Sequence, residues 1–124
     1  LGRQDGFPIC IGRDLEGQGR RGVVTRGGLA CLAGQVADDA TLEVEGQTAD
    51  ILAQIDALLA SLGTDKTRIL SVQIFLTDIN DIGAMNRAWD VWLDPAHKPA
   101  RATVEAQLAN PAWRVEITAI AALR

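Results

Sequence analysis

The sequence has no tyrosine, and aromatic residues make up only 4% of its 124 residues. Tight protein interfaces are usually built on aromatic anchors, so such an interface is not expected to be the main device of this chain. No apolar run approaches the roughly 20 residues of a membrane-spanning helix, and no signal-peptide pattern stands at the N-terminus. These absences predict a soluble, cytoplasmic protein that has no membrane partner.

Two cysteines, Cys10 and Cys31, are too few for a disulfide framework and lack the spacing of a zinc site. No glycine-rich phosphate-binding motif is present, so phosphate or dinucleotide binding has no support. The net charge of -4 disfavours nucleic acid, because protein affinity for phosphates comes mostly from lysine and arginine. The basic trio Arg20, Arg21 and Arg26 is more typical of a solvated or interface feature than of a nucleic-acid groove.

The length of 124 residues is that of one domain, because two cores would each bury too little surface. A hydrophobic share of 48% and a charged share of 23% are those of a globular chain. Residues 1–19 are rich in glycine and have no sustained period, which predicts a loose N-terminal segment. Residues 20–124 are expected to form the single domain.

Three regular segments are predicted in the first two thirds of the chain. The Gly27-Gly28 pair divides two short apolar stretches within residues 22–34, and adjacent glycines allow the positive φ angles of a tight hairpin. From Val44 apolar residues recur every three or four positions, which predicts a helix that Gly63 ends. Residues 69–77 change to a period of about two and are rich in β-branched residues, which predicts a largely buried strand.

The last third of the chain predicts one helix and two strands. A second helix is expected after Asp78 and its polar neighbours, because these residues are favourable N-caps, and Pro95 marks its end. Strands are predicted at residues 101–108 and 113–123, with the turn-forming residues 109–112 between them.

The predicted fold is α+β with the order ββαβαββ. Each helix between two strands suggests a crossover, while the first two and the last two strands are expected to form antiparallel hairpins. The sheet should therefore be mixed, with both helices on one face. Apolar residues on the uncovered face would favour self-association, since burial is worth about 25 cal/mol per Å².

Two charged residues in predicted strands are candidates for chemistry. Glu116 lies between Val115 and Ile117, where a carboxylate is costly unless it is paired or used; a solvated edge or a structural ion pair is the alternative interpretation. Arg101 opens a strand, and a guanidinium on a rigid element can bind a carboxylate through two parallel hydrogen bonds. An arginine at a strand start is otherwise usually a surface residue.

Asn86 lies in the second predicted helix, where a short amide prefers a specific hydrogen-bond partner, although exposure also explains it. His97 is the single histidine, but it stands in a proline-flanked turn without an obvious serine or cysteine partner and is treated as a loop residue. Trp89, Trp92 and Trp113 are expected to be core or subunit-contact residues.

Several motifs together resemble the Rid (YjgF/RidA) family, from about residue 22 to the C-terminus. These are Leu32-Ala-Gly-Gln35, Gln47-Thr-Ala-Asp-Ile-Leu-Ala-Gln-Ile, Ile74-Phe-Leu-Thr-Asp78, Met85-Asn86, Pro99-Ala-Arg101-Ala-Thr-Val-Glu105 and Val115-Glu-Ile117. The last two are the most specific. Asn86-Arg-Ala-Trp-Asp-Val-Trp and Asn110-Pro-Ala-Trp resemble a divergent bacterial subgroup more than the RidA group proper.

The resemblance implies a chorismate-mutase-like fold and a homotrimer with ligand sites in the clefts between subunits. It also implies the activity of the best-characterised members, which hydrolyse reactive enamines and imines. This reaction needs neither a metal nor an organic cofactor, since an imine is already an electrophile. Carried over by motif, Arg101 would hold the substrate carboxylate and Glu116 would position or activate water. Gly34 would line the cleft, Asn86 would support the site, and Thr103 would contact the substrate.

Two departures from the RidA pattern bear on the substrate. Arg20 falls near the place of an aromatic residue that usually precedes the first paired strand, and Thr103 stands where cysteine is frequent. A non-catalytic trimer that senses keto acids or related metabolites is the alternative function. The ribonuclease or translation inhibition ascribed to some relatives is less compatible with the acidic charge.

Overall fold

The structure is a computed structural model that describes residues 22–124. The predictions for residues 1–19, Arg20 and Arg21 lie outside the described residues. The elements are β2 (Val23–Arg26), β3 (Leu29–Gln35), α1 (Val44–Ser61), η2 (Lys66–Arg68), β4 (Ile69–Leu76), η3 (Ile79–Asp81), α2 (Ile82–Trp92), β5 (Ala100–Glu105) and β6 (Val115–Ala122). Apart from the two short 3-10 helices, this is the predicted ββαβαββ order.

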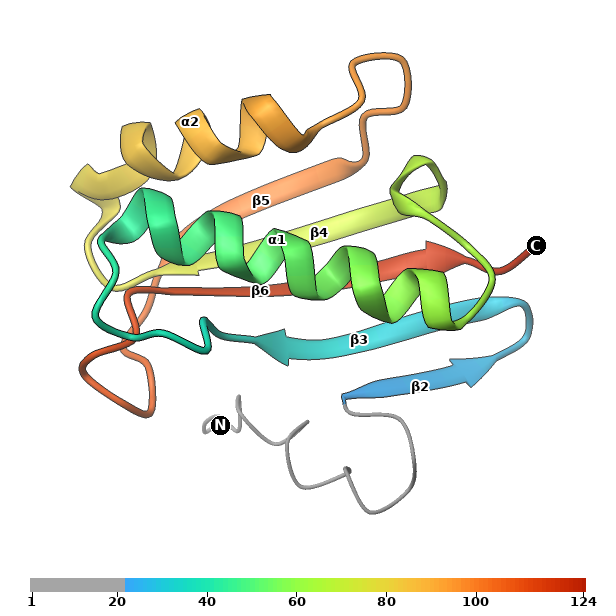
Figure 1. The fold of residues 1–124 in the computed structure, drawn as a ribbon, viewed down its shortest axis with the longest axis horizontal. Helices are drawn as coiled ribbons and strands as arrows, with labels where there is room; N and C mark the ends of the chain where they lie inside the picture. Colours follow the sequence, from blue (N-terminus) through green and yellow to red (C-terminus); the bar gives the residue numbers. More distant parts are fainter. Residues whose placement is uncertain (1–21) are drawn as a thin grey trace.

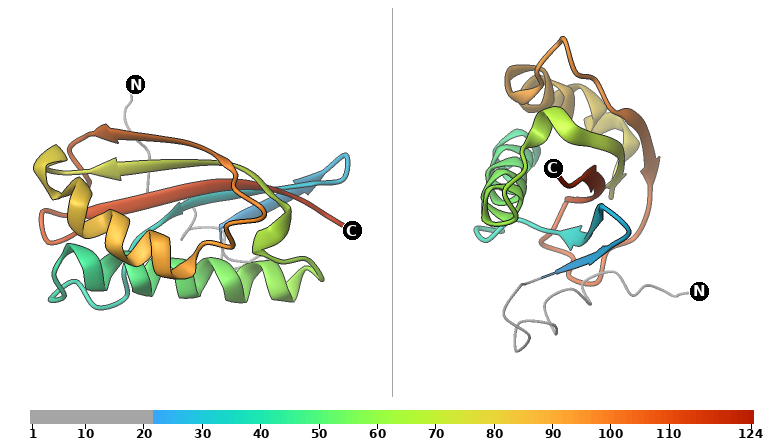
Figure 2. Two further views of the ribbon diagram at one scale, coloured as in Figure 1. Left: turned by 90° about the horizontal axis from the view of Figure 1, so that it is seen from above. Right: turned by 90° about the vertical axis from the view of Figure 1, so that its right-hand side faces the viewer.

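The five strands form one mixed sheet with the order β2-β3-β6-β4-β5 (Figure 1). Strands β4 and β5 are parallel, and every other neighbouring pair is antiparallel. Both α-helices lie on the same face of this sheet, as the view from above in Figure 2 shows. The predicted α+β class and the one-sided layer of helices are therefore confirmed.

The expected hairpin between the last two strands is wrong. Strand β6 lies between β3 and β4, where Ile117 is opposite Ile74 and Ala121 is opposite Ala30. The α2 crossover brings β5 back parallel to β4 at the edge of the sheet. Residues 106–114 then carry the chain across to the gap between β3 and β4, where β6 gains a strand neighbour on each side.

Local signals set the bounds of the helices. Helix α1 begins at Val44 as predicted, and Gly63 follows its last turn with a φ of 75°, a conformation that glycine adopts without a steric cost. Asp78 does act as a cap, because its Oδ1 accepts a hydrogen bond from the Asn80 N–H at 2.9 Å. The element that it caps is η3, and α2 begins only after that turn, at Ile82.

The core lies between the two helices and the sheet. Ile51 and Ile55 of α1 pack against Ile74 and Ile117 of the central strands, and each of these side chains is at most 1% exposed. No helix within residues 22–124 is long and apolar enough to cross a membrane.

The opposite face of the sheet, here called the open face, carries apolar residues from several strands, and no other element of residues 22–124 covers it. Val24 and Ile120 are opposite neighbours of Cys31 on β3, and Val104 of β5 is the neighbour of Phe75 on β4. Val24, Val104 and Ile120 remain 54%, 45% and 37% exposed. The predicted uncovered face with apolar residues from several strands is thus present.

A buried amide ties α1 to the loop that leads into β6. Gln47 has no exposed surface, and its Nε2 donates to the carbonyls of Ala40, Leu42 and Ala112 at 3.3, 3.0 and 3.1 Å. Its Oε1 accepts a hydrogen bond from the Arg114 N–H at 2.9 Å. One side chain therefore satisfies backbone groups of two loops and fixes where β6 begins.

Replacing Gln47 by leucine is expected to lower the free energy of unfolding by about 3 kcal/mol, because it leaves buried backbone groups without their partner. Urea denaturation followed by circular dichroism measures the change. Gln107→Leu, at an exposed loop position, is the matched control and should change stability by less than about 0.5 kcal/mol. Equal midpoints for the two variants would contradict the proposed tie.

Candidate functional site

The first cluster surrounds Arg101 on the edge strand β5. Arg101 is the parallel neighbour of Val72, a core residue, and so points to the side of the sheet that carries the helices. Its Nη1 donates to Asn86 Oδ1 at 2.9 Å and lies 4.0 Å from the Met85 sulfur. The guanidinium carbon stands 5.1 Å from the centroid of the Trp89 ring. Two predicted site residues, Arg101 and Asn86, are thus in direct contact.

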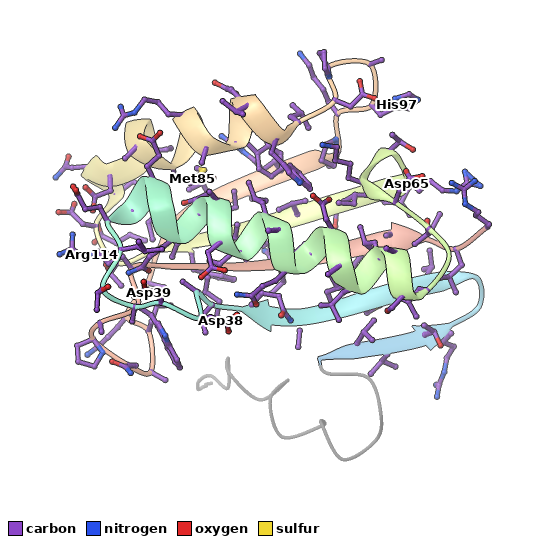
Figure 3. The ribbon with its side chains drawn as sticks, in the orientation of Figure 1. Asp38, Asp39, Asp65, Met85, His97 and Arg114 are labelled. Atoms are coloured by element: carbon purple, nitrogen blue, oxygen red, sulfur yellow. The ribbon has the colours of Figure 1, made fainter. Side chains whose placement is uncertain are left out.

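Helix α2 supplies all three partners of this guanidinium. Met85, labelled in Figure 3, and Asn86 lie one turn before Trp89 on the same side of the helix. Asn86 was predicted as a site residue from the motifs, whereas Trp89 was expected only in the core or at a subunit contact. The spacing of three residues between Asn86 and Trp89 indicates that the two side chains lie on the same side of a helix. It does not indicate which strand lies opposite that side.

Thr103 follows two positions after Arg101 and points to the same side, where its neighbour is Ile74. Its hydroxyl oxygen is buried and has no hydrogen-bond partner among the described residues. Glu105, the next residue in this row, accepts a hydrogen bond from the Ile79 N–H at 2.8 Å and so caps η3. Arg101 and Thr103 therefore share one row of β5, as their predicted roles require.

The second cluster lies at Glu116, in the centre of the sheet. Its side chain has no exposed surface, so the solvated-edge interpretation does not hold for it. Gly34 lies in the irregular part of β3 where the register with β6 shifts. A Cβ on Gly34 would stand 1.9 Å from Glu116 Oε2, so only glycine leaves room for the carboxylate there. Two further predicted site residues are thus adjacent.

The two clusters lie on opposite faces of the sheet. Arg101 is the neighbour of Val72, whereas Glu116 is the neighbour of Phe75, three positions further along β4. Because side chains alternate along a strand, an odd spacing places them on opposite faces. Glu116 therefore points to the open face, and a single subunit does not bring Arg101 and Glu116 together.

Three aspartates in turns and loops outside both clusters have a shifted pKa. His97 is exposed in the loop after α2 (Figure 3), with Nδ1 3.2 Å from Asp94 Oδ2. Hydrogen bonds from the Ala96 N–H and then from His97 lower the pKa of Asp94. Hydrogen bonds from threonines two positions on lower the pKa of Asp39 and of Asp65. Within residues 22–124 no cluster of three such side chains could hold a metal ion.

A groove of about 730 Å³ separates α1 from α2 on the outer side of the helical layer. The groove is open because small side chains line it, among them Ala49 and Ala53 of α1 and Ala84 and Ala88 of α2. None of the predicted site residues lines the groove, and sequence analysis did not predict it.

The family model described as Endoribonuclease L-PSP matches residues 20–123. The chain belongs to the Rid (YjgF/RidA) family. A RutC family protein from Haemophilus influenzae is 50% identical over 95 residues, which are 75% of this chain and 81% of that protein. These matches confirm the family that the motifs predicted.

Solved structures agree with this assignment. A YjgF family protein from Neisseria meningitidis superposes with a TM-score of 0.80 at 45% identity, covering 84% of this chain and 87% of the other. A protein from Yersinia pestis, described as a Rid family member of unknown function, gives a TM-score of 0.76 at 30% identity and covers 83% and 86%. The two helices on a mixed sheet are therefore the fold of the Rid family.

Proposed function

We propose that this chain is a homotrimeric, cytoplasmic enamine/imine deaminase that hydrolyses 2-imino acids to 2-keto acids and ammonia. The observation that carries the proposal is the presence of two groups: a guanidinium held on an edge strand, and a carboxylate without exposed surface that points to the face of the sheet opposite the helices. Membership of the Rid family supports the same chemistry.

The placement of these groups supports the proposed assembly. Val24, Val104 and Ile120 on the open face are partly exposed to water. Contact with a second copy of the chain would remove that apolar surface from water. In a cyclic oligomer the interface is repeated between successive subunits. The open face near Glu116 of one subunit can then meet the β5 edge of its neighbour, which brings Arg101 to the same cleft.

The proposed chemistry is hydrolysis of the imine, assisted by proton transfer through Glu116. Arg101 binds the substrate carboxylate through two parallel hydrogen bonds and so orients the protonated imine. Water adds to the electrophilic imine carbon, and Glu116 accepts the proton that the water loses. The protonated Glu116 then returns this proton to the amine of the tetrahedral adduct. The C–N bond then breaks, its electron pair leaves with ammonia, and Glu116 takes the hydroxyl proton of the adduct as the carbonyl forms. Ammonia accepts this proton from Glu116 and leaves as ammonium, so neither a metal nor an organic cofactor is required.

The direct test generates a 2-imino acid in situ with an amino-acid oxidase and follows its disappearance. Wild-type protein should accelerate keto-acid formation well above the rate in buffer. A wild-type rate equal to the buffer rate would reject the enzymatic proposal. Saturable heat from a 2-keto acid in calorimetry, without turnover of the imine, would instead favour the metabolite-sensing trimer.

Gly34→Ala is expected to lower kcat by about tenfold or more, because the new methyl group must displace the Glu116 carboxylate. The in situ imine assay measures this, and circular dichroism checks the fold. Gly83→Ala is the control, since a Cβ at Gly83 meets nothing within 4 Å. Alanine favours the helix at this position by about 1 kcal/mol. Because the new methyl group touches no other residue, the activity of Gly83→Ala should be unchanged. Equal kcat values for the two variants would contradict the cradle at Gly34.

A further inference from the structure

The Arg101 guanidinium is held from two directions by side chains of α2. We propose that Asn86 and Trp89 are positioning residues, which orient this guanidinium so that one particular edge receives the substrate carboxylate. The identity of the ligand rests on the proposed function, whereas the holding of the guanidinium is a property of this fold.

The contacts recorded within residues 22–124 engage only one nitrogen of the guanidinium. Nη1 meets Asn86 Oδ1 at 2.9 Å and the Met85 sulfur at 4.0 Å, and these two acceptors match its two N–H groups. The edge formed by Nε and Nη2 carries two parallel N–H groups, the arrangement that a carboxylate accepts side-on. Asn86 therefore selects the edge that is left for the ligand.

Trp89 restricts the guanidinium through a different contact, a cation–π interaction with its ring. Its ring lies 5.1 Å from the Arg101 guanidinium carbon, and its side chain is only 5% exposed. The ring of Trp92 packs against it at 5.3 Å with a tilt of 51°. A cation stacked on a buried indole loses rotational freedom before any ligand arrives.

Trp92 is in turn held by residues from other elements. Its Nε1 donates to Asp56 Oδ2 of α1 at 2.9 Å, and the Lys66 ammonium of η2 stands 5.1 Å from its ring centroid. The platform under Arg101 is thus held by residues of α1 and η2 as well as by α2. A positioned anchor of this kind reduces the entropy that substrate binding must remove.

The chemistry of the Asn86 side chain provides the sharpest test. An amide oxygen accepts the hydrogen bond from Nη1 without neutralising Arg101. Asn86→Asp has almost the same shape, but its carboxylate would bind the guanidinium as an internal competitor of the substrate. We expect it to raise KM by about tenfold or more with kcat within about twofold, because carboxylate binding is lost equally from ground and transition states.

Asn80→Asp adds the same charge at an exposed position of η3 and should leave both constants unchanged. Trp89→Leu should raise KM by a similar factor as Asn86→Asp, and Trp89→Phe, which keeps an aromatic face, should retain most of the affinity. If Asn86 and Trp89 only stabilised the fold, their variants would contain a smaller fraction of folded, active enzyme. The apparent kcat would then fall and KM would stay unchanged. An unchanged KM in Asn86→Asp would overturn the assignment of Asn86.

A second readout needs no substrate. In protein labelled with ¹⁵N-arginine, the Arg101 side-chain resonances should be shifted upfield by the Trp89 ring, with its Nη signals resolved by slow rotation. Trp89→Leu and Asn86→Ala should lose these signatures, and spectra identical to wild type would overturn the proposal even in an active enzyme. If wild-type protein shows the signatures and the variants lose them, positioning stands even where no imine is hydrolysed, and only the proposed function fails.

Discussion

Replacing Arg101 by alanine is expected to lower kcat/KM for 2-imino acids by on the order of 1000-fold, which corresponds to about 4 kcal/mol. Two charge-assisted hydrogen bonds to one carboxylate account for a loss of this size. Most of the effect should be in KM, because the carboxylate does not change during the reaction. Arg101→Lys keeps the charge but not the paired N–H groups, so it should recover only part of the affinity.

The matched control is Arg87→Ala. Arg87 lies on α2, the helix whose side chains contact Arg101. Arg87 is paired with Glu45 at 2.9 Å and has a side chain that is 65% exposed, so its loss removes the same charge without touching the site. Its activity should equal that of wild type. An Arg101→Ala enzyme within about threefold of wild type would show that the substrate carboxylate binds elsewhere.

Glu116→Gln is expected to lower kcat by about 1000-fold with little change in KM. General acid and base catalysis contributes about 100- to 10,000-fold, and an amide cannot accept the proton of the attacking water. The substitution is nearly isosteric and so respects the space above Gly34. Because Arg101 still binds the carboxylate, the opposite split between kcat and KM should separate the two roles.

Glu45→Gln is the control for this variant, because Glu45 is half-exposed on α1 and pairs only with Arg87 among the described residues. It should retain wild-type kcat. Thermal unfolding of Glu116→Gln must still show a cooperative transition, which separates lost chemistry from lost fold. If kcat stays within about tenfold of wild type, Glu116 is not the proton acceptor.

Short-range patterns predicted most of the fold because they are set by neighbouring residues. The three-and-four spacing after Val44, the stop at Gly63 and the Gly27-Gly28 turn each correspond to an observed element. The pairing of the last two strands failed because a turn near residues 109–112 shows only that the chain reverses. The strand that pairs with β6 depends on where a place is free in the sheet, and this place lies between β3 and β4. A pattern of neighbouring residues does not show such a place.

The candidate site was predictable only in part for the same reason. Motifs identified Arg101, Asn86, Gly34 and Glu116, and the structure places them in two contacting pairs. Sequence could not show that these pairs lie on opposite faces, because that follows from the registers of β5 and β6 against β4. Trp89 was missed as a partner of Arg101, since a large apolar side chain on a helix is first explained by the core.

A subunit-mixing experiment tests the shared site most directly. Arg101→Ala and Glu116→Gln subunits are each expected to be nearly inactive alone. In mixed oligomers, formed by co-expression at equal amounts, a site is complete where Arg101 comes from one variant and Glu116 from the other. Random mixing should then restore about a quarter of wild-type activity. Mixed oligomers, verified by mass spectrometry, that remain as inactive as either parent would contradict a site built from two subunits.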